Sequence, residues 1–221
     1  MVEAVTDRQG MSSTGTIFRP LVAFDFDGTL TSEDSFTAFL AWKVGPARYA
    51  AGVAALAAAG AGYLFDRDRG RLKAATVKRF LAGMTREELE AAAQAFATDR
   101  GRALLRPDAM RAWRRWQAES ARLIVVTASP EIVVAPIVRA IGADTLIGTR
   151  LAFDAQGRVT GALDGANCRG AEKVRRLKAM FGEDVKLEAA YGDTDGDKEM
   201  LTLAEEQGLK VFNGVNRGGK L

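Results

Sequence analysis

Residues 24–34 read FDFDGTLTSED, and this stretch decides the fold. It continues an apolar run that begins at Leu21, so we expect a buried strand over Leu21–Phe26. Asp25 and Asp27 are two residues apart, which would place both carboxylates on the same side of that strand. Like charges this close repel each other, and burying them costs stability unless a positive charge compensates. The stretch therefore predicts a functional site at the end of the strand.

Short apolar runs elsewhere in the chain predict further buried strands. With the first, the strands are expected at Leu21–Phe26, Leu123–Thr127, Leu187–Tyr191 and Leu209–Phe212. Helical patterns accompany the later strands at Glu131–Ile141, Ala171–Phe181 and Asp197–Glu206. This alternation indicates an α/β fold with a doubly wound parallel sheet. The segment LAFDAQGRVTGAL (Leu151–Leu163) predicts a β-hairpin with its turn at Ala155–Gly157.

The long segment between the first two strands carries helical patterns and no strand signal. The helical patterns cover Ser32–Val44, Ala47–Phe65 and Lys73–Leu81. A further helix is expected from Thr85 to about Ala97, because Thr85 and Glu88 form a capping box. Pro107 is expected in the first turn of another helix that runs through Glu119. Because the N-terminal residues are polar, we expect a disordered leader at 1–19. The α/β core would then comprise 20–34 and 106–221, with an inserted helical cap domain at 35–105.

Composition excludes several kinds of chemistry. The 221 residues include 31 basic and 28 acidic side chains, and the net charge of +3 does not indicate a nucleic-acid-binding protein. The absence of histidine excludes Ser-His and Cys-His nucleophile systems and histidine zinc sites. The single cysteine, Cys168, excludes an internal disulfide framework and suits the reducing cytoplasm. No stretch has the apolar character of a signal peptide or a membrane span, so we expect a cytoplasmic protein.

Polar side chains concentrate where the predicted strands end. They are Asp25 and Asp27 after the first strand, Thr127 and Ser129 after the second, Asp193, Asp195 and Asp197 in YGDTDGD after the next, and Lys173 near the start of the preceding helix. In an open parallel sheet these ends meet at one crevice, where ligands bind. Clustered carboxylates suit Mg²⁺, which takes one or two of them together with a substrate phosphate. One aspartate could then attack phosphorus.

Four short motifs follow one another in a fixed order along the chain. They are DFDGTL (Asp25–Leu30), the hydroxyl residue Thr127 at the end of an apolar strand, Lys173, and GDTDGD (Gly192–Asp197). In order and spacing they resemble the motifs of the haloacid dehalogenase superfamily of phosphohydrolases, over nearly the whole chain after the leader. A helical cap between the first two motifs resembles subfamily IB, which contains phosphoserine phosphatases. The resemblance implies a Rossmann-like core and a Mg²⁺-dependent phosphatase.

The resemblance also implies a role for each matching residue. Asp25 would be the nucleophile, and Asp27 would protonate the leaving group and later activate water, as an acid–base group worth about 10²–10⁴-fold in rate. Thr127 would hydrogen-bond the phosphoryl group, and Lys173 would offset the negative charges. The groups implied to bind phosphate belong to Phe26, Asp27, Gly28, Thr127, Ala128 and Lys173. The implied metal ligands are Asp25, Asp27 through its carbonyl, Asp193 and Asp197.

Several alternative interpretations remain for individual features. Ser129 could cap a helix that follows Pro130 or contact the ligand, and Asp195 could face solvent. DTDGDKEML begins like an EF-hand calcium loop, but the sixth and twelfth positions hold Lys198 and Ala204 where Gly and Glu are needed. A receiver-like regulator that stores phosphate on Asp25 is the non-enzyme alternative. Asp27 argues against it, because an acid–base group beside the nucleophile promotes turnover.

The substrate is expected to be a phosphorylated small molecule or a lipid phosphate. Phosphoserine phosphatases carry Glu nine residues after the nucleophile and Ser-Gly-Gly at the second motif, whereas this chain has Asp34 and TAS (Thr127–Ser129). TASPE and CRGAEKV resemble instead a bacterial branch that includes a phosphatidylglycerophosphate phosphatase. Asp34 remains the candidate substrate-binding residue.

The cap contains an uncharged stretch, Tyr49–Phe65, that is flanked by bases. The bases between Trp42 and Arg79 are Lys43, Arg48, Arg67, Arg69, Arg71, Lys73, Lys78 and Arg79. Such a helix could lie on the inner face of an anionic membrane and admit a lipid phosphate. Alternatively, it packs as a helical hairpin, and the bases serve a soluble substrate that carries two anionic groups.

Overall fold

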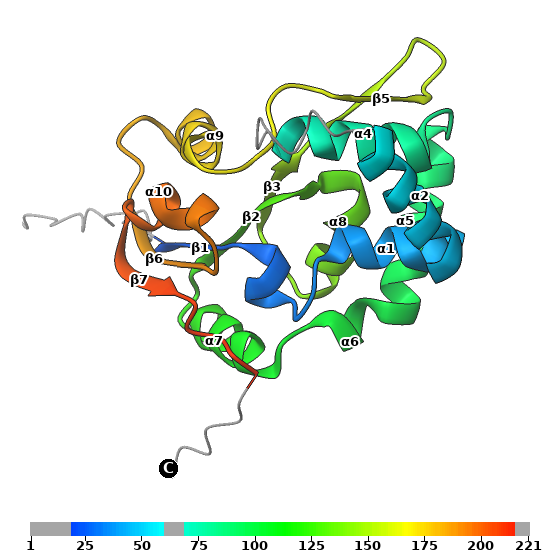
Figure 1. The fold of residues 1–221 in the computed structure, drawn as a ribbon. Coiled ribbons are helices and arrows are strands. Elements are labelled where there is room, and N and C mark those ends of the chain that lie inside the picture. The colour runs from blue at the N-terminus through cyan, green and yellow to red at the C-terminus, as the bar shows by residue number, and fades with distance from the viewer. Residues whose placement is uncertain (1–18, 60–68, 215–221) are drawn as a thin grey trace, which may run out of the picture.

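The computed structural model describes residues 19–59 and 69–214 (Figure 1). A five-stranded parallel sheet forms its centre, in the order β3-β2-β1-β6-β7. Its strands are β1 (Leu21–Phe24), β2 (Arg122–Pro130), β3 (Thr145–Thr149), β6 (Leu187–Gly192) and β7 (Ala204–Leu209). From the central β1 the chain builds one side of the sheet and then the other, which confirms the doubly wound α/β fold.

Helices cover both faces of the sheet. They are α7 (Pro107–Ala118) and α8 (Glu131–Ala140) on one face, and α9 (Ala171–Phe181) and α10 (Lys198–Leu201) on the other. Alternate side chains of β1 enter the two cores, because successive residues of a strand face opposite ways. Phe24 packs against Trp113 of α7, with ring centroids 5.1 Å apart. Ala23 packs on the opposite side, with Leu177 of α9.

Between β1 and β2 the described residues are mainly helical, as predicted. After a short turn at Phe26–Leu30 come α1 (Ser35–Val44), α2 (Pro46–Ala59), α4 (Arg69–Leu81), α5 (Arg86–Phe96), a second turn at Ala97–Gly101 and α6 (Arg102–Leu104). Figure 1 shows α1, α2, α4 and α5 grouped beside the sheet. The predicted capping box of Thr85 and Glu88 begins α5, and Pro107 lies in the first turn of α7. The predicted helix beyond Ala59 and most of the predicted leader lie outside the described residues.

The predicted hairpin is present as β4 (Leu151–Phe153) and β5 (Val159–Leu163), joined through Ala155–Gly157. It is hydrogen-bonded to the connection between α4 and α5. Gly83 N–H donates to the Val159 carbonyl at 2.9 Å, and Val159 N–H donates to the Met84 carbonyl at 2.8 Å. The hairpin therefore ties the segment after β3 to the helices that precede β2.

Three expectations about local structure were wrong. β1 ends at Phe24, because the chain winds into the turn at Phe26–Leu30 and does not stay extended through Phe26. The predicted helix at Asp197–Glu206 stops at Leu201, and the strand expected at Leu209–Phe212 is β7, which begins at Ala204. β7 is an edge strand with mostly exposed side chains, so it lacks the apolar run of a buried strand. The sequence analysis also missed β3, the other edge strand.

The helices of the described residues include none with the length and apolarity that crossing a membrane would require.

Candidate active site

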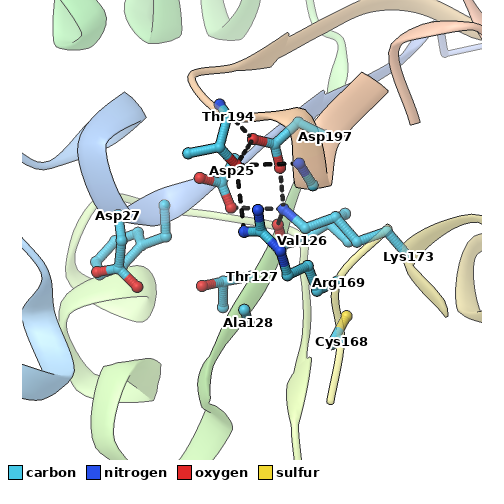
Figure 2. Close-up of polar contacts among 12 residues, drawn as sticks. Asp25, Asp27, Val126, Thr127, Ala128, Cys168, Arg169, Lys173, Thr194 and Asp197 are labelled. Carbon is cyan, nitrogen blue, oxygen red and sulfur yellow. Dashed lines mark hydrogen bonds and ion pairs between the residues drawn. The ribbon is translucent and has the colours of Figure 1, made fainter. Parts of the chain in front are cut away.

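Lys173 and Asp25 form the centre of the site (Figure 2). Asp25 directly follows β1, and Lys173 lies in the first turn of α9; both are buried. The Lys173 Nζ donates to Asp25 Oδ1 at 2.5 Å, to Asp197 Oδ1 at 2.7 Å and to the Val126 carbonyl at 2.6 Å. These three acceptors use all the donors of the ammonium group. Burial alone would lower the pKa of Lys173, but Asp25 and Asp197 raise it above its usual value, so the lysine is charged.

The Asp25 carboxylate is less easily ionised than a free aspartate. Burial raises its pKa to about 7, and the attraction of Lys173 offsets only part of this effect. Repulsion from Asp197 raises the pKa further. A cation at the site would favour the ionised form, which is the nucleophilic one.

Three carboxylates could hold that cation. Asp25, Asp193 and Asp197 each place an oxygen within 4.8 Å of the others. Asp193 Oδ1 is buried and has no hydrogen-bond partner among the described residues, which is costly for a carboxylate oxygen. Burial, together with the charge of Asp197, raises the pKa of Asp193. A hard divalent cation such as Mg²⁺ would satisfy this oxygen and compensate the charges, so the donor set fits the predicted cofactor.

Asp197 has a second, structural role at this cluster. Its Oδ2 accepts hydrogen bonds from the backbone N–H and the hydroxyl of Thr194, at 2.9 and 3.0 Å. With Lys173 on Oδ1, both oxygens are already bonded. Asp197 therefore mainly stabilises the cluster through its hydrogen bonds. Asp193 provides the carboxylate oxygen that has no hydrogen-bond partner among the described residues.

Gly28 is required beside Asp193. Its φ of +79° lies in the left-handed region, and a Cβ built there would come within 2.2 Å of Asp193 Oδ2. A side chain at this position would displace the carboxylate. The glycine of DFDGTL therefore permits the backbone to approach the acidic cluster.

Asp27 has different partners from Asp25. Its Oδ1 accepts the backbone N–H of Ser35 at 2.7 Å, and its Oδ2 accepts the hydroxyl of Ser129 at 2.5 Å. The expectation that both carboxylates lie on one side of a strand was wrong, because the strand has already ended; Figure 2 shows Asp27 apart from the Asp25–Lys173 pair. Burial raises the pKa of Asp27, and Asp34 adds repulsion, while the bonds from Ser129 and Ser35 lower it.

The end of β2 places the predicted phosphate-binding residues next to the carboxylates. Thr127 is fully buried, and its Oγ1 accepts the N–H of Ser129 at 3.0 Å. The carbonyl of Ala128 accepts the Thr149 hydroxyl at 2.7 Å. The side chain of Phe26 is buried, and its carbonyl accepts the Thr31 N–H at 2.9 Å.

Lys73 is a site residue that the sequence analysis named only among the bases of the cap. From α4 its Nζ reaches the Ala128 carbonyl at 2.5 Å and lies 5.9 Å from the centroid of the Phe36 ring. Burial lowers its pKa, although Asp27, Asp34 and Asp25 oppose the shift. Within the described parts of the chain, Lys73 forms no ion pair. A half-buried lysine without an ion pair in the described residues therefore faces the site from the helical segment.

A cavity of about 1230 Å³ lies between the sheet and the helices. The site residues that line it are Asp25, Asp27, Gly28, Lys73, Ala128, Lys173, Asp193 and Asp197, whereas Phe26 and Thr127 do not line it. Asp34 also lines it, and one oxygen of its carboxylate caps α1 by accepting the Thr37 N–H at 2.7 Å. Helices α1, α2 and α4 contribute an apolar wall that includes Phe36, Leu40, Tyr49, Val53, Leu56 and Leu72.

Comparison with known proteins shows similarity in sequence and in fold. Protein CicA of Caulobacter vibrioides is 56% identical over 194 residues, which cover 88% of this chain and 87% of that protein. A solved structure of a protein with unknown function from Bordetella pertussis Tohama I has a TM-score of 0.71 at 26% identity, covering 86% of this chain and 88% of the other. A phosphoserine phosphatase, solved as an analogue of its phospho-aspartyl intermediate, has a TM-score of 0.55 at 22% identity and covers 86% and 85%, a likeness of fold alone.

The model of one protein family matches residues 22–202, the span from β1 through α10 that contains all four motifs. The match covers the acidic cluster, Lys173 and the helical segment together. The chain therefore belongs to the haloacid dehalogenase-like hydrolases.

Proposed function

We propose that the protein is a Mg²⁺-dependent phosphatase that hydrolyses phosphate monoesters through an aspartyl-phosphate on Asp25. One observation carries this proposal: a buried carboxylate lies between a charged lysine and an acidic cluster with an unsatisfied oxygen. When bound by Asp25, Asp193 and the Asp27 carbonyl, with Asp197 in support, Mg²⁺ would offset the charge on the phosphoryl oxygens. The helical segment 35–105 would act as a cap domain that limits the access of water.

The proposed reaction has two steps. An oxygen of Asp25 attacks phosphorus, the bond to the leaving oxygen breaks, and that oxygen takes a proton from Asp27. In the second step a water molecule attacks the aspartyl-phosphate, gives a proton to Asp27 and releases phosphate and the free Asp25 carboxylate. Thr127 would bind the phosphoryl oxygens, together with backbone groups of Phe26–Gly28 and Ala128, and the charge of Lys173 would offset their negative charge.

The apolar wall of the cavity favours a substrate with an apolar leaving group. A lipid phosphate such as phosphatidylglycerophosphate is the first candidate, and its entry would require the cap to touch the inner face of the membrane. Val53 and Leu72, at 41% and 51% exposed, provide apolar surface on that wall. Phosphoserine is the second candidate, and for it Asp34 would meet the amino group.

Phosphate release from a panel of substrates tests the function. The panel contains phosphatidylglycerophosphate in detergent, phosphoserine, and soluble sugar and nucleotide monophosphates, each with Mg²⁺ and with EDTA. We expect release to require Mg²⁺ and to be greatest for the lipid. A preference for a soluble compound would move the proposal to the second candidate, and Mg²⁺-independent release would contradict the metal site.

Lys73 should contribute to substrate binding more than to chemistry. The substitution Lys73→Met removes the amino group but keeps an unbranched side chain beside the Phe36 ring. A hydrogen bond to a charged group is worth about 1.5–3 kcal/mol, so we expect KM to rise by at least about tenfold with kcat nearly unchanged. Steady-state kinetics on the best substrate of the panel measure both.

Lys78→Met is the matched control for this prediction. Lys78 is on the same helix, but it is exposed and packs against Gly161 of the hairpin. The control should keep the KM of the original protein. An equal KM for Lys73→Met would show that the cap lysine does not meet the substrate.

A further inference from the structure

Ser129 lies between two residues of the proposed reaction without belonging to the set that binds the substrate. It is fully buried near the end of β2. Its hydroxyl donates to Asp27 Oδ2 at 2.5 Å, and its backbone N–H donates to Thr127 Oγ1 at 3.0 Å. We infer that Ser129 is a positioning residue, whose hydroxyl orients the Asp27 carboxyl for proton transfer. This inference rests on the proposed function.

The structure supports neither sequence-based interpretation of Ser129. The residue that caps α8 is Pro130, which makes no side-chain capping bond, so Ser129 does not cap this helix. Its side chain is buried against Asp27, so its oxygen does not face the cavity as a ligand-binding group would. Leaving a buried hydroxyl without a hydrogen-bond partner costs free energy, and the partner of Ser129 is the proposed acid–base group.

Two donors from separate elements hold the Asp27 carboxyl. The N–H of Ser35 in α1 bonds Oδ1, and the hydroxyl of Ser129 in β2 bonds Oδ2. Together they fix the rotation of the carboxyl plane, and proton transfer depends on such alignment. A backbone N–H can only donate, whereas a hydroxyl can donate to an ionised carboxylate and accept from a protonated one. Ser129 therefore suits a group that gains and loses a proton in each cycle.

The expected consequence depends on the leaving group. An alkoxide is a poor leaving group and needs the proton from Asp27, whereas p-nitrophenolate leaves without much assistance. The ratio kcat/KM reports the steps up to cleavage of the bond to the leaving oxygen. Misplacing the Asp27 proton should therefore reduce kcat/KM for an alkyl phosphate much more than for p-nitrophenyl phosphate.

We would measure kcat/KM for the best alkyl phosphate of the panel and for p-nitrophenyl phosphate with Ser129→Ala, Ser129→Cys and Ser129→Thr. For Ser129→Ala we expect a loss of about tenfold or more with the alkyl substrate, part of the general-acid contribution of 10²–10⁴-fold, and less than about threefold with the aryl substrate. Ser129→Thr keeps the hydroxyl and should restore the alkyl activity. Ser129→Cys keeps the size with a weaker donor and should be intermediate, and it serves as the test variant if Ser129→Ala does not fold.

Thr149→Val is the matched control, because Thr149 also carries a buried hydroxyl that bonds the same strand end, at Ala128. It should lower the melting temperature without changing the ratio of alkyl to aryl activity. Equal losses on both substrates for Ser129→Ala would overturn the positioning role. The proposed function fails on a different result. It is contradicted if the unmodified protein releases phosphate without Mg²⁺, or if Asp25→Asn retains substantial phosphate release.

Discussion

Asp25→Asn should reduce phosphate release by roughly 10⁴-fold or more, as expected when the nucleophile of a catalytic unit is removed. The amide cannot form the aspartyl-phosphate, so the remaining machinery has no covalent route. The substitution is nearly isosteric, and Lys173 keeps its bonds to Asp197 and the Val126 carbonyl. The loss should therefore occur in a folded protein. Single-turnover assays with Mg²⁺ and circular dichroism of the same sample measure the two properties.

Asp195→Asn provides the matched control for this substitution. Asp195 belongs to the same GDTDGD motif, but its side chain is 86% exposed and pairs with Lys198 at 2.8 Å. The same chemical change there should leave activity within about twofold, because exposed ion pairs contribute little. Substantial turnover by Asp25→Asn would remove Asp25 as the nucleophile.

Because the pKa of Asp25 is raised, the difference in the free energy of unfolding between the original protein and Asp25→Asn should depend on pH. Burial raises it from 3.8 to about 7, so between these values the folded protein binds more protons than the unfolded chain. The free energy of unfolding then falls as pH rises from about 4 to about 7. Asp25→Asn lacks this term, so in EDTA its stability relative to the original protein should increase over the same range. Urea unfolding at several pH values measures the difference.

The parallel sheet could be predicted because its central strands are apolar on both faces. The runs beginning at Leu21, Leu123 and Leu187 are buried from both sides, and such runs stand out in a sequence. The edge strand β7 has only two buried residues and was misplaced, whereas the edge strand β3 combines two threonines and a glycine with Leu146 and Ile147 and was missed. Neither sequence contains a continuous run of large apolar residues, so each leaves a weaker pattern.

The meeting of Asp25, Lys173, Asp193 and Asp197 followed from topology, since the carboxyl ends of neighbouring parallel strands share one edge. The orientation of Asp27 could not be foreseen, because it depends on where β1 stops and the next turn begins. The approach of Lys73 to Ala128 depends on how α4 packs over the sheet, and no local pattern reports such a contact. Sequence thus places the residues attached to strand ends, while the contacts between the helical segment and the core need the structure.

Asp27→Asn should slow both chemical steps. Loss of a general acid and base costs about 10²–10⁴-fold, and we expect a loss in this range for kcat/KM on an alkyl phosphate. The fold should persist, because the amide oxygen can still accept the Ser35 N–H and the amide N–H₂ can donate to the Ser129 hydroxyl. With p-nitrophenyl phosphate the first step should be less affected than the second, since only the second then needs Asp27.

A covalent intermediate should therefore accumulate in Asp27→Asn with the aryl substrate. Acid quenching during turnover, followed by mass spectrometry of the intact protein, should show one added phosphoryl group, and p-nitrophenolate should appear in a burst. The double variant with Asp25→Asn should show neither, which locates the group on Asp25. If Asp27→Asn retains its rate on alkyl phosphates, proton transfer must come from another group, and the hydrogen bonds from Ser35 and Ser129 would then serve only the fold. If the rate falls but no phosphoenzyme appears, the first step alone depends on Asp27 and water is activated elsewhere.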